Sequence, residues 1–376
     1  MNKIYLFTAA FAVMASLSGC SDTELASIDT AQEKTPIGFH TVGSQMGSRA
    51  KIINSSEDLK NYSFNVYAFT RNEADGSDGT VFMGTNDAVS GYKGVNISYQ
   101  GGKWGYTTPT ELKYWPTGAL NFYAVSPVVE IPTYSWQISD SKKEISVIMQ
   151  DEYKDPDNSA ENVDVMYAIS KNQTQSINEG TVKMNFRHIF SQVAFKARTD
   201  IPNMEVTIEG IKIYNFHSIG TFSLPNTDAE PTQTNWNWTD VGYITGSFTA
   251  VKDKSIDVEN TETKISMDEP MLFIPQKLNK WATTAASPMS ITQANTAKQS
   301  YLEISCRIKL DREYRVGTES TFGQLYVPFG ADWQPGKRYI YTLVFGGGYK
   351  ADGTPILKPI NITADTEPWD DKTFDL

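Results

Sequence analysis

Residues that could perform metal or nucleophilic chemistry are few in this sequence. The 376 residues include three histidines, His40, His188 and His217, and two cysteines, Cys20 and Cys306. The histidines lack the spacing of zinc ligands, and the sequence contains no HExxH, paired-cysteine, Gly-x-Ser-x-Gly or phosphate-loop motif. We therefore expect no cofactor, no catalytic residue and no enzymatic activity, and we interpret His188, which falls in a strand pattern, as structural.

Two acidic loops offer oxygen ligands of the kind that calcium prefers. "EADGSDG" contains Asp75 and Asp78, and "DPDNSAENVD" contains Asp155, Asp157 and Asp164. Neither loop has the spacing of an EF-hand, and Asp-Gly and Asp-Pro are ordinary turn pairs. We interpret both loops as turns and expect no metal site, with a structural calcium ion as the alternative.

The two cysteines have different surroundings. In "YLEISCRIKL", Cys306 alternates in phase with Leu302, Ile304 and Ile308, which places it on the apolar face of a strand as a small core residue. Nothing near it in sequence would lower the pKa of its thiol, so we do not expect a reactive cysteine.

Cys20 follows the only long apolar run. Ile4–Leu17 is too short to span a bilayer and has the length of a signal-peptide core. Its end, "LSGC", resembles a bacterial lipobox, which implies cleavage before Cys20 and acylation of that residue. Several acyl chains give stable anchoring. We therefore expect a lipoprotein signal peptide at 1–19 and a flexible polar tether at 20–34, and we favour this over an ordinary secretory signal with a chance cysteine.

The segment after the tether contains a candidate processing site. "TPIGFHTV", residues 35–42, predicts a short strand with Ile37 and Phe39 on one face. "GSQMGSRAK" follows as an exposed loop, and such loops are where proteases cut. Arg49-Ala50 is a trypsin-like bond in it. On these residues alone, a plain loop is the simpler interpretation.

Strands must position all of these residues. The 19 Tyr, 18 Phe and 8 Trp favour strands, and period-2 runs separated by Gly, Pro, Asn and Asp predict an all-β antiparallel fold. The pattern changes phase within residues 182–197 and again at Glu209-Gly210, which predicts a bulge or a strand crossing between sheets. We predict two sandwich domains, 35–180 and 181–376. The net charge of −11 argues against a nucleic-acid partner.

Four stretches carry a family resemblance: "KYWPTGALNFYAVSP", "MNFRHIFSQVAFKA", "DWQPGKRYIYTLVFGGG" and the terminal "EPWDD". With the lipobox and the strand ending in "SRA", their order resembles the fimbrillin-like (Mfa-like) family, lipoprotein subunits of the type V pili of Gram-negative anaerobes. The resemblance implies two tandem transthyretin-like β-sandwiches and a place in a fimbrium at the outer membrane that supports adhesion. It also implies assembly with other fimbrial subunits. An arginine-specific protease would cut after Arg49, residues 35–42 would leave, and a strand from a neighbouring subunit would fill the groove.

The C-terminal region departs from the shaft subunits of that family, which hold their donor strand there. Here only Lys372–Leu376 follows "PWDD". If the terminal segment is paired within its own sandwich, the subunit accepts a strand without donating one, as a tip or accessory subunit would. If Arg49 is not cut, the subunit stays lipid-bound as an anchor.

Two other functions are compatible with an all-β lipoprotein. A monomeric surface lipoprotein could bind glycans through Trp236 and Trp238, whose spacing puts both on one strand face, although two half-buried strand tryptophans are the simpler interpretation. A secreted β-sandwich hydrolase is the other, and no motif supports it.

Overall fold

Strands make up almost all of the regular structure. The computed structural model describes residues 34–42, 56–85, 93–128, 134–149, 163–228, 237–242, 247–266, 271–357 and 360–368. The helical elements in these ranges are short: α1 (Ser56–Leu59), α2 (Ile291–Thr296) and the 3-10 turns η1 (Pro109–Glu111) and η2 (Ile177–Gly180). None of the described helices has the length and apolar character needed to cross a membrane. The predicted all-β fold class is confirmed.

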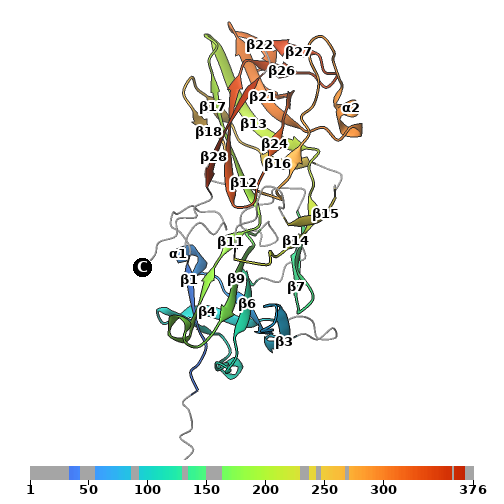
Figure 1. The fold of residues 1–376 in the computed structure, drawn as a ribbon. Coiled ribbons are helices and arrows are strands. Elements are labelled where there is room, and N and C mark those ends of the chain that lie inside the picture. Colours follow the sequence, from blue (N-terminus) through green and yellow to red (C-terminus); the bar gives the residue numbers. More distant parts are fainter. Residues whose placement is uncertain are drawn as a thin grey trace, which may run out of the picture. The chain divides into compact units, whose positions relative to one another are not determined.

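One sheet lies in the first half (Figure 1), and apolar side chains are buried on both of its faces. In β6, Leu120, Phe122 and Ala124 face one side, as the sequence predicts, whereas Tyr123 and Val125 face the other. Because both faces exclude water, the strand is apolar at consecutive positions. The strands, in spatial order, are β11 (Arg187–His188), β9 (Met166–Gln173), β6 (Leu120–Ser126), β2 (Phe64–Arg71), β4 (Val95–Gln100) and β5 (Lys103–Tyr106), with β3 (Asp78–Met83) also paired to β2.

Two smaller layers cover this sheet. The face that carries Phe122 packs against β1 (Gly38–Val42) and β10 (Thr181–Asn185). The opposite face carries Tyr167, whose ring centroid lies 5.2 Å from that of Phe222 in a second layer. The strands of that layer are β15 (Trp238–Gly242), β14 (Ile219–Ser223), β8 (Lys143–Ile148) and β7 (Tyr134–Ile138).

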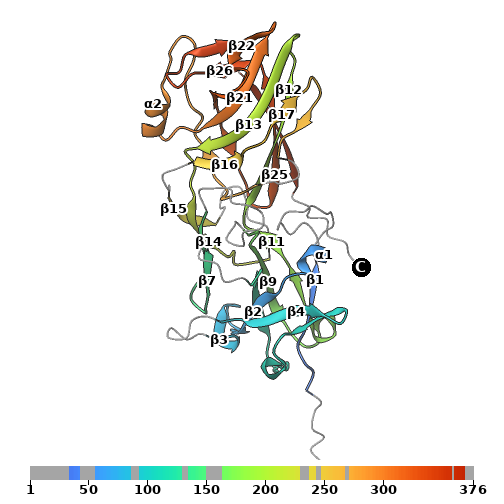
Figure 2. The ribbon, with the colours of Figure 1, turned by 180° about the vertical axis from the view of Figure 1, so that it is seen from behind.

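Further sheets enclose the core of the second half (Figure 2). One consists of β18 (Thr263–Lys264), β12 (Ser191–Thr199), β25 (Lys337–Phe345) and β28 (Asn361–Pro368), with β19 (Met271–Phe273) on β12. Another consists of β16 (Ser247–Val251), β13 (Met204–Tyr214), β21 (Tyr301–Leu310), β23 (Gly323–Pro328), β26 (Gly347–Tyr349) and β27 (Pro355–Leu357), with β17 (Ile256–Val258) on β13 and β22 (Glu313–Val316) on β21. The short strands β20 (Lys277–Leu278) and β24 (Ala331–Asp332) pair separately.

Both predicted phase changes have a structural cause. Residues 181–199 form β10, β11 and β12, and each of these strands belongs to a different sheet. At Glu209, the register of β13 against β21 shifts, so that Ile208 pairs with Cys306 and Gly210 with Ser305. The first phase change is therefore a crossing between sheets, and the second is a β-bulge.

Strand pairing connects residues on the two sides of position 180. Strand β10 pairs with β1, β11 pairs with β9, and β14 pairs with β8. The division into domains 35–180 and 181–376 stays a prediction.

Candidate assembly site

The short strand β1 is held in place by a segment far along the chain. It pairs in parallel with β10, from Gly38 opposite Thr181 to Val42 opposite Asn185 (Figure 1). Parallel strands need a long connection between them. Here that connection contains strands β2 to β9.

One side of this segment is buried and the other is exposed. Ile37, Phe39 and Thr41 are 1%, 6% and 6% exposed, whereas Pro36 and His40 are exposed. The predicted alternation, with Ile37 and Phe39 on one face, is confirmed. Each of these two side chains contributes roughly 1.5–3 kcal/mol of hydrophobic stabilisation when fully buried.

Phe39 fills a pocket of aromatic rings that sequence reasoning did not identify. Its ring centroid lies 6.3 Å from Phe64, 5.9 Å from Tyr106 and 6.2 Å from Phe122, in edge-to-face arrangements. Such pairs add about 0.5–1.5 kcal/mol each beyond their area burial. Burial raises the pKa of the Tyr106 hydroxyl to about 12, so this ring stays neutral.

The residues before β1 are bound to the loop that precedes β6. The Ile37 amide donates to the Lys113 carbonyl at 2.9 Å, and the Trp115 amide donates to the Thr35 carbonyl at 3.0 Å. The Trp115 indole donates in turn to the carbonyl of Gly180 at 2.9 Å. Gly180 has a φ of 80°, and a Cβ there would lie 3.0 Å from the Trp115 indole nitrogen, so this contact favours glycine.

We call the site that β1 occupies the β1 slot, and we define it by β10 and the rings of Phe64, Tyr106 and Phe122. Departure of β1 would leave the adjacent backbone edge of β10 without its ladder partner and would expose these apolar rings. Unpaired edges of this kind accept strands from other chains. The slot therefore holds its strand through backbone pairing and apolar burial.

The predicted modification residues Cys20, Arg49 and Ala50 lie outside the described residues, as do Asp155, Asp157 and Trp236. Their assignments stay predictions.

The histidines do not gather into a site. His40 is exposed on β1, His217 is half-buried, and burial lowers the pKa of His217. His188 is 7% exposed, and its Nδ1 lies 2.9 Å from Oδ1 of the fully buried Asp164. Asp164, one of the candidate calcium ligands, thus pairs with His188. No group of three or more metal-ligating side chains occurs in the described part of the chain.

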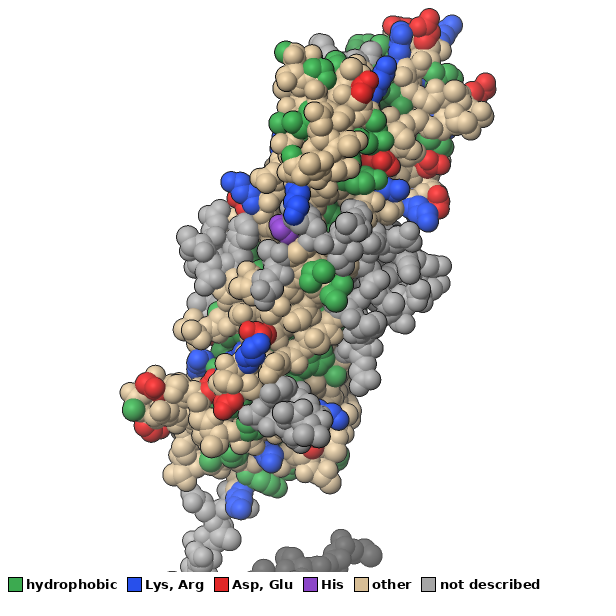
Figure 3. All heavy atoms as spheres, turned by 90° about the vertical axis from the view of Figure 1, so that its right-hand side faces the viewer, with side chains coloured by type: hydrophobic (Ala, Val, Ile, Leu, Met, Phe, Trp, Pro, Cys, Tyr) green, Lys and Arg blue, Asp and Glu red, His purple; other side chains and the backbone are tan. Residues whose placement is uncertain are grey.

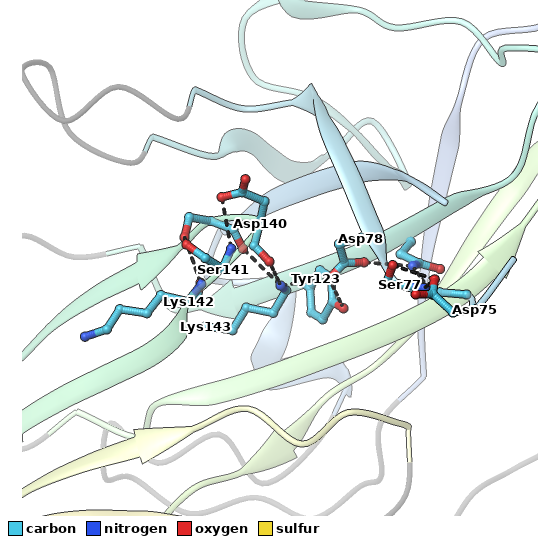
Figure 4. A network of polar contacts seen from close by, with 11 residues as sticks. Asp75, Ser77, Asp78, Tyr123, Asp140, Ser141, Lys142 and Lys143 are labelled. Atoms are coloured by element: carbon cyan, nitrogen blue, oxygen red, sulfur yellow. Dashed lines mark hydrogen bonds and ion pairs between the residues drawn. The ribbon is translucent and has the colours of Figure 1, made fainter. Parts of the chain in front are cut away.

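Asp78, another candidate calcium ligand, contacts hydrogen-bond donors instead (Figure 4). Lys143 Nζ and the Tyr123 hydroxyl each lie 2.7 Å from its Oδ2, and Asn121 Nδ2 lies 2.7 Å from its Oδ1. Burial alone would raise the pKa of Asp78, but these donors outweigh it and hold the pKa below its usual value. The side chains of Asp78 and Lys143 are 7% and 15% exposed, so they form a nearly buried ion pair that joins β3 to β8.

Cys306 and Trp238 lie where the sequence predicts them, as a core residue and a half-buried strand residue. Cys306 is fully buried on the apolar face of β21, and burial raises the pKa of its thiol to about 12. Trp238 is half-buried, packs against Phe190 and Phe222 with ring centroids 6.0 and 5.6 Å away, and donates to the Ile189 carbonyl at 3.3 Å. It therefore packs against the core and is no open platform for a sugar.

The terminal strand β28 is paired within its own sheet. It runs antiparallel to β25, from Lys337 opposite Pro368 to Val344 opposite Asn361. Residues 363–366 are exposed although they are in the ladder. Backbone pairing rather than side-chain burial therefore holds the outer part of this strand.

The surface in Figure 3 carries acidic and basic side chains intermixed, with apolar side chains between them. Among the described residues, this face therefore presents no extended surface of a single charge sign.

Comparison with known proteins agrees with this architecture. A family model described as "Fimbrillin-like" matches residues 55–369. The fimbrium subunit Fim1C of Phocaeicola vulgatus is 24% identical over 310 residues, which cover 74% of this chain and 79% of that protein. A crystal structure of a fimbrial protein from Bacteroides vulgatus has a TM-score of 0.59 at 16% identity, covering 89% of this chain and 99% of that one. The match to the family model spans most of the chain, and the chain therefore belongs to the fimbrillin-like family.

Proposed function

We propose that this protein is a structural subunit of a cell-surface fimbria and that it accepts a donor strand from a neighbouring subunit in the β1 slot. The observation that carries the proposal is β1 itself. Phe39 of this strand and Ile37 just before it are buried among residues of the following strands, yet both precede the Fimbrillin-like match at residues 55–369. Because β1 completes the hydrophobic core but lies outside residues 55–369, a strand from another subunit can take its place.

The precursor reaches the outer membrane as a lipoprotein acylated at Cys20. An arginine-specific protease then cuts between Arg49 and Ala50. Before the cut, β1 is tethered to its slot, and the effective concentration of a tethered strand is of millimolar order for a short flexible linker. After the cut β1 can dissociate, and a strand of another subunit competes for the slot on equal terms.

The pairing of β28 with β25 argues against β28 as a donor strand for another subunit. Withdrawing β28 would break the ladder from Lys337 to Val344. We therefore assign the subunit a tip or accessory position, in which it receives a strand and supports adhesion. If Arg49 stays intact, the same chain remains bound to the membrane as an anchor. In either case the role is structural and not catalytic.

Proteolysis of the purified chain tests the proposal. A Cys20→Ser chain, which cannot be acylated, is treated with an arginine-specific protease and mixed with a fimbrial subunit of the same cell. We expect a complex that survives SDS without heating. The matched control Arg49→Lys removes the cleavage site and keeps the charge, and it should yield no complex. A complex that forms equally well with Arg49→Lys would refute strand replacement.

A further inference from the structure

A hollow lies where the bulged part of β13 meets β16 and β21. It has a volume of about 250 Å³. This is slightly less than the range for pockets that hold drug-sized ligands, about 300–1,000 Å³, so the hollow suits a ligand of ring size. We call it the bulge hollow, and its polar lining includes Glu209, Lys212, Thr249, Glu303, Ser305 and Gln324.

Two β-bulges, one on β13 and one on β16, adjoin the hollow. Glu209 is the extra residue of β13 opposite β21, and Ala250 is the extra residue of β16 opposite β13. Between these two irregularities lies Gly210, which contributes no side chain. A Cβ at this position would come within 3.0 Å of the Val251 carbonyl oxygen. The close approach of the β16 backbone therefore favours glycine at this bulge, and bulges recur beside functional sites.

The carboxylates of the bulge hollow are held in fixed orientations. Glu209 accepts a hydrogen bond from the Ser305 hydroxyl at 2.5 Å. Glu303 accepts one from the Tyr214 hydroxyl at 3.2 Å, and the ring of Tyr214 stacks on Tyr301 with centroids 4.8 Å apart. Each carboxylate has two oxygens and can accept several hydrogen bonds. Both can therefore accept further hydrogen bonds from a ligand.

The charges of the lining restrict the ligand class. Lys212 lies 4.0 Å from Glu303, and Lys252 also lines the hollow, so a metal cation would meet two ammonium groups. Glu209, Glu303 and Asp253 oppose an anion. A neutral ligand that carries both donors and acceptors fits this mixture, because neighbouring hydroxyl groups can donate to a carboxylate and accept from an ammonium or amide group.

We infer that the bulge hollow binds a neutral sugar ring, a hexose or an N-acetylhexosamine at the end of a surface glycan. Tyr326 is half-buried and does not line the hollow, but as the cross-strand neighbour of Glu303 it lies on the same face of the sheet, and we expect its ring to border a bound sugar. The site is independent of the β1 slot, so either can fail without the other.

Saturation-transfer NMR with the Cys20→Ser chain tests the inference, with galactose and N-acetylglucosamine as probes and sialic acid as the anionic comparison. We expect transfer from at least one neutral sugar and at least tenfold weaker binding in Glu303→Gln. The exposed Gln324→Ala is a second variant that leaves the tyrosine contacts intact, and it should weaken binding severalfold.

The matched controls are Glu205→Gln and Lys309→Met. These residues form a 3.5 Å ion pair across the same two strands outside the hollow, and their loss should leave sugar binding unchanged. Absence of transfer from both neutral sugars, preference for sialic acid, or binding insensitive to both Glu303→Gln and Gln324→Ala would overturn the inference.

Discussion

Replacing Phe39 by alanine tests how strongly the β1 slot holds its strand. The Phe39 side chain is 6% exposed and meets three aromatic rings at centroid distances of 5.9–6.3 Å. Burial of the ring contributes about 1.5–3 kcal/mol, and each edge-to-face contact adds about 0.5–1.5 kcal/mol. Core Phe→Ala substitutions cost about 3–5 kcal/mol. Because β1 can shift to fill part of the cavity, we expect a loss near the lower limit, about 3 kcal/mol.

Denaturant unfolding of the uncleaved Cys20→Ser chain measures this loss. The matched control is His40→Ala, because His40 is exposed on the same strand and surface substitutions usually stay within about 0.5 kcal/mol. The same Phe39 variant should also release the cleaved β1 segment faster after arginine-specific proteolysis. A change below about 1 kcal/mol for Phe39→Ala, or equal changes for both variants, would mean that β1 does not depend on this pocket.

Three further predictions concern residues outside the slot. Asp78→Asn should lower the free energy of unfolding by about 3 kcal/mol, because it leaves Lys143 nearly buried without its carboxylate; denaturant unfolding that matches the unsubstituted chain would argue against a stabilising ion pair. The pKa of Asp78 is lowered in the folded state, so its stabilisation is complete above the ordinary pKa of 3.8 and is lost as the pH falls through the folded value; unfolding midpoints between about pH 2 and pH 6 should therefore fall more steeply for the unsubstituted chain than for Asp78→Asn. Cys306 should resist maleimide at pH 8 and react only after unfolding, because burial raises the pKa of its thiol to about 12; rapid labelling of the native chain would contradict its place in the core.

Local patterns predicted the faces of strands well. Ile37 and Phe39 are buried together, and Cys306 lies in the core, because alternation with a period of two follows from backbone geometry alone. The irregularity at Glu209-Gly210 was likewise predictable, since a bulge changes the phase of that alternation.

Contacts between distant segments could not be predicted in the same way. Nothing in the sequence near β1 indicates that β10 is its partner, that the pairing is parallel, or that Tyr106 lines the slot. The ion pair of Asp78 with Lys143 was missed for the same reason, since the acidic loop suggested only turns or calcium. A signal existed at Trp115, whose turn motif precedes β6, but its bond to Gly180 depends on tertiary structure.

If β1 is removed before assembly, the N-terminus of assembled chains must lie beyond residue 42. Fimbriae sheared from cells are purified as polymers, and the N-terminal peptide of this subunit is identified by mass spectrometry. We expect polymerised chains to begin at Ala50 and to lack residues 35–42. Polymers in which the chain begins at acylated Cys20 and retains β1 would contradict strand replacement in the β1 slot.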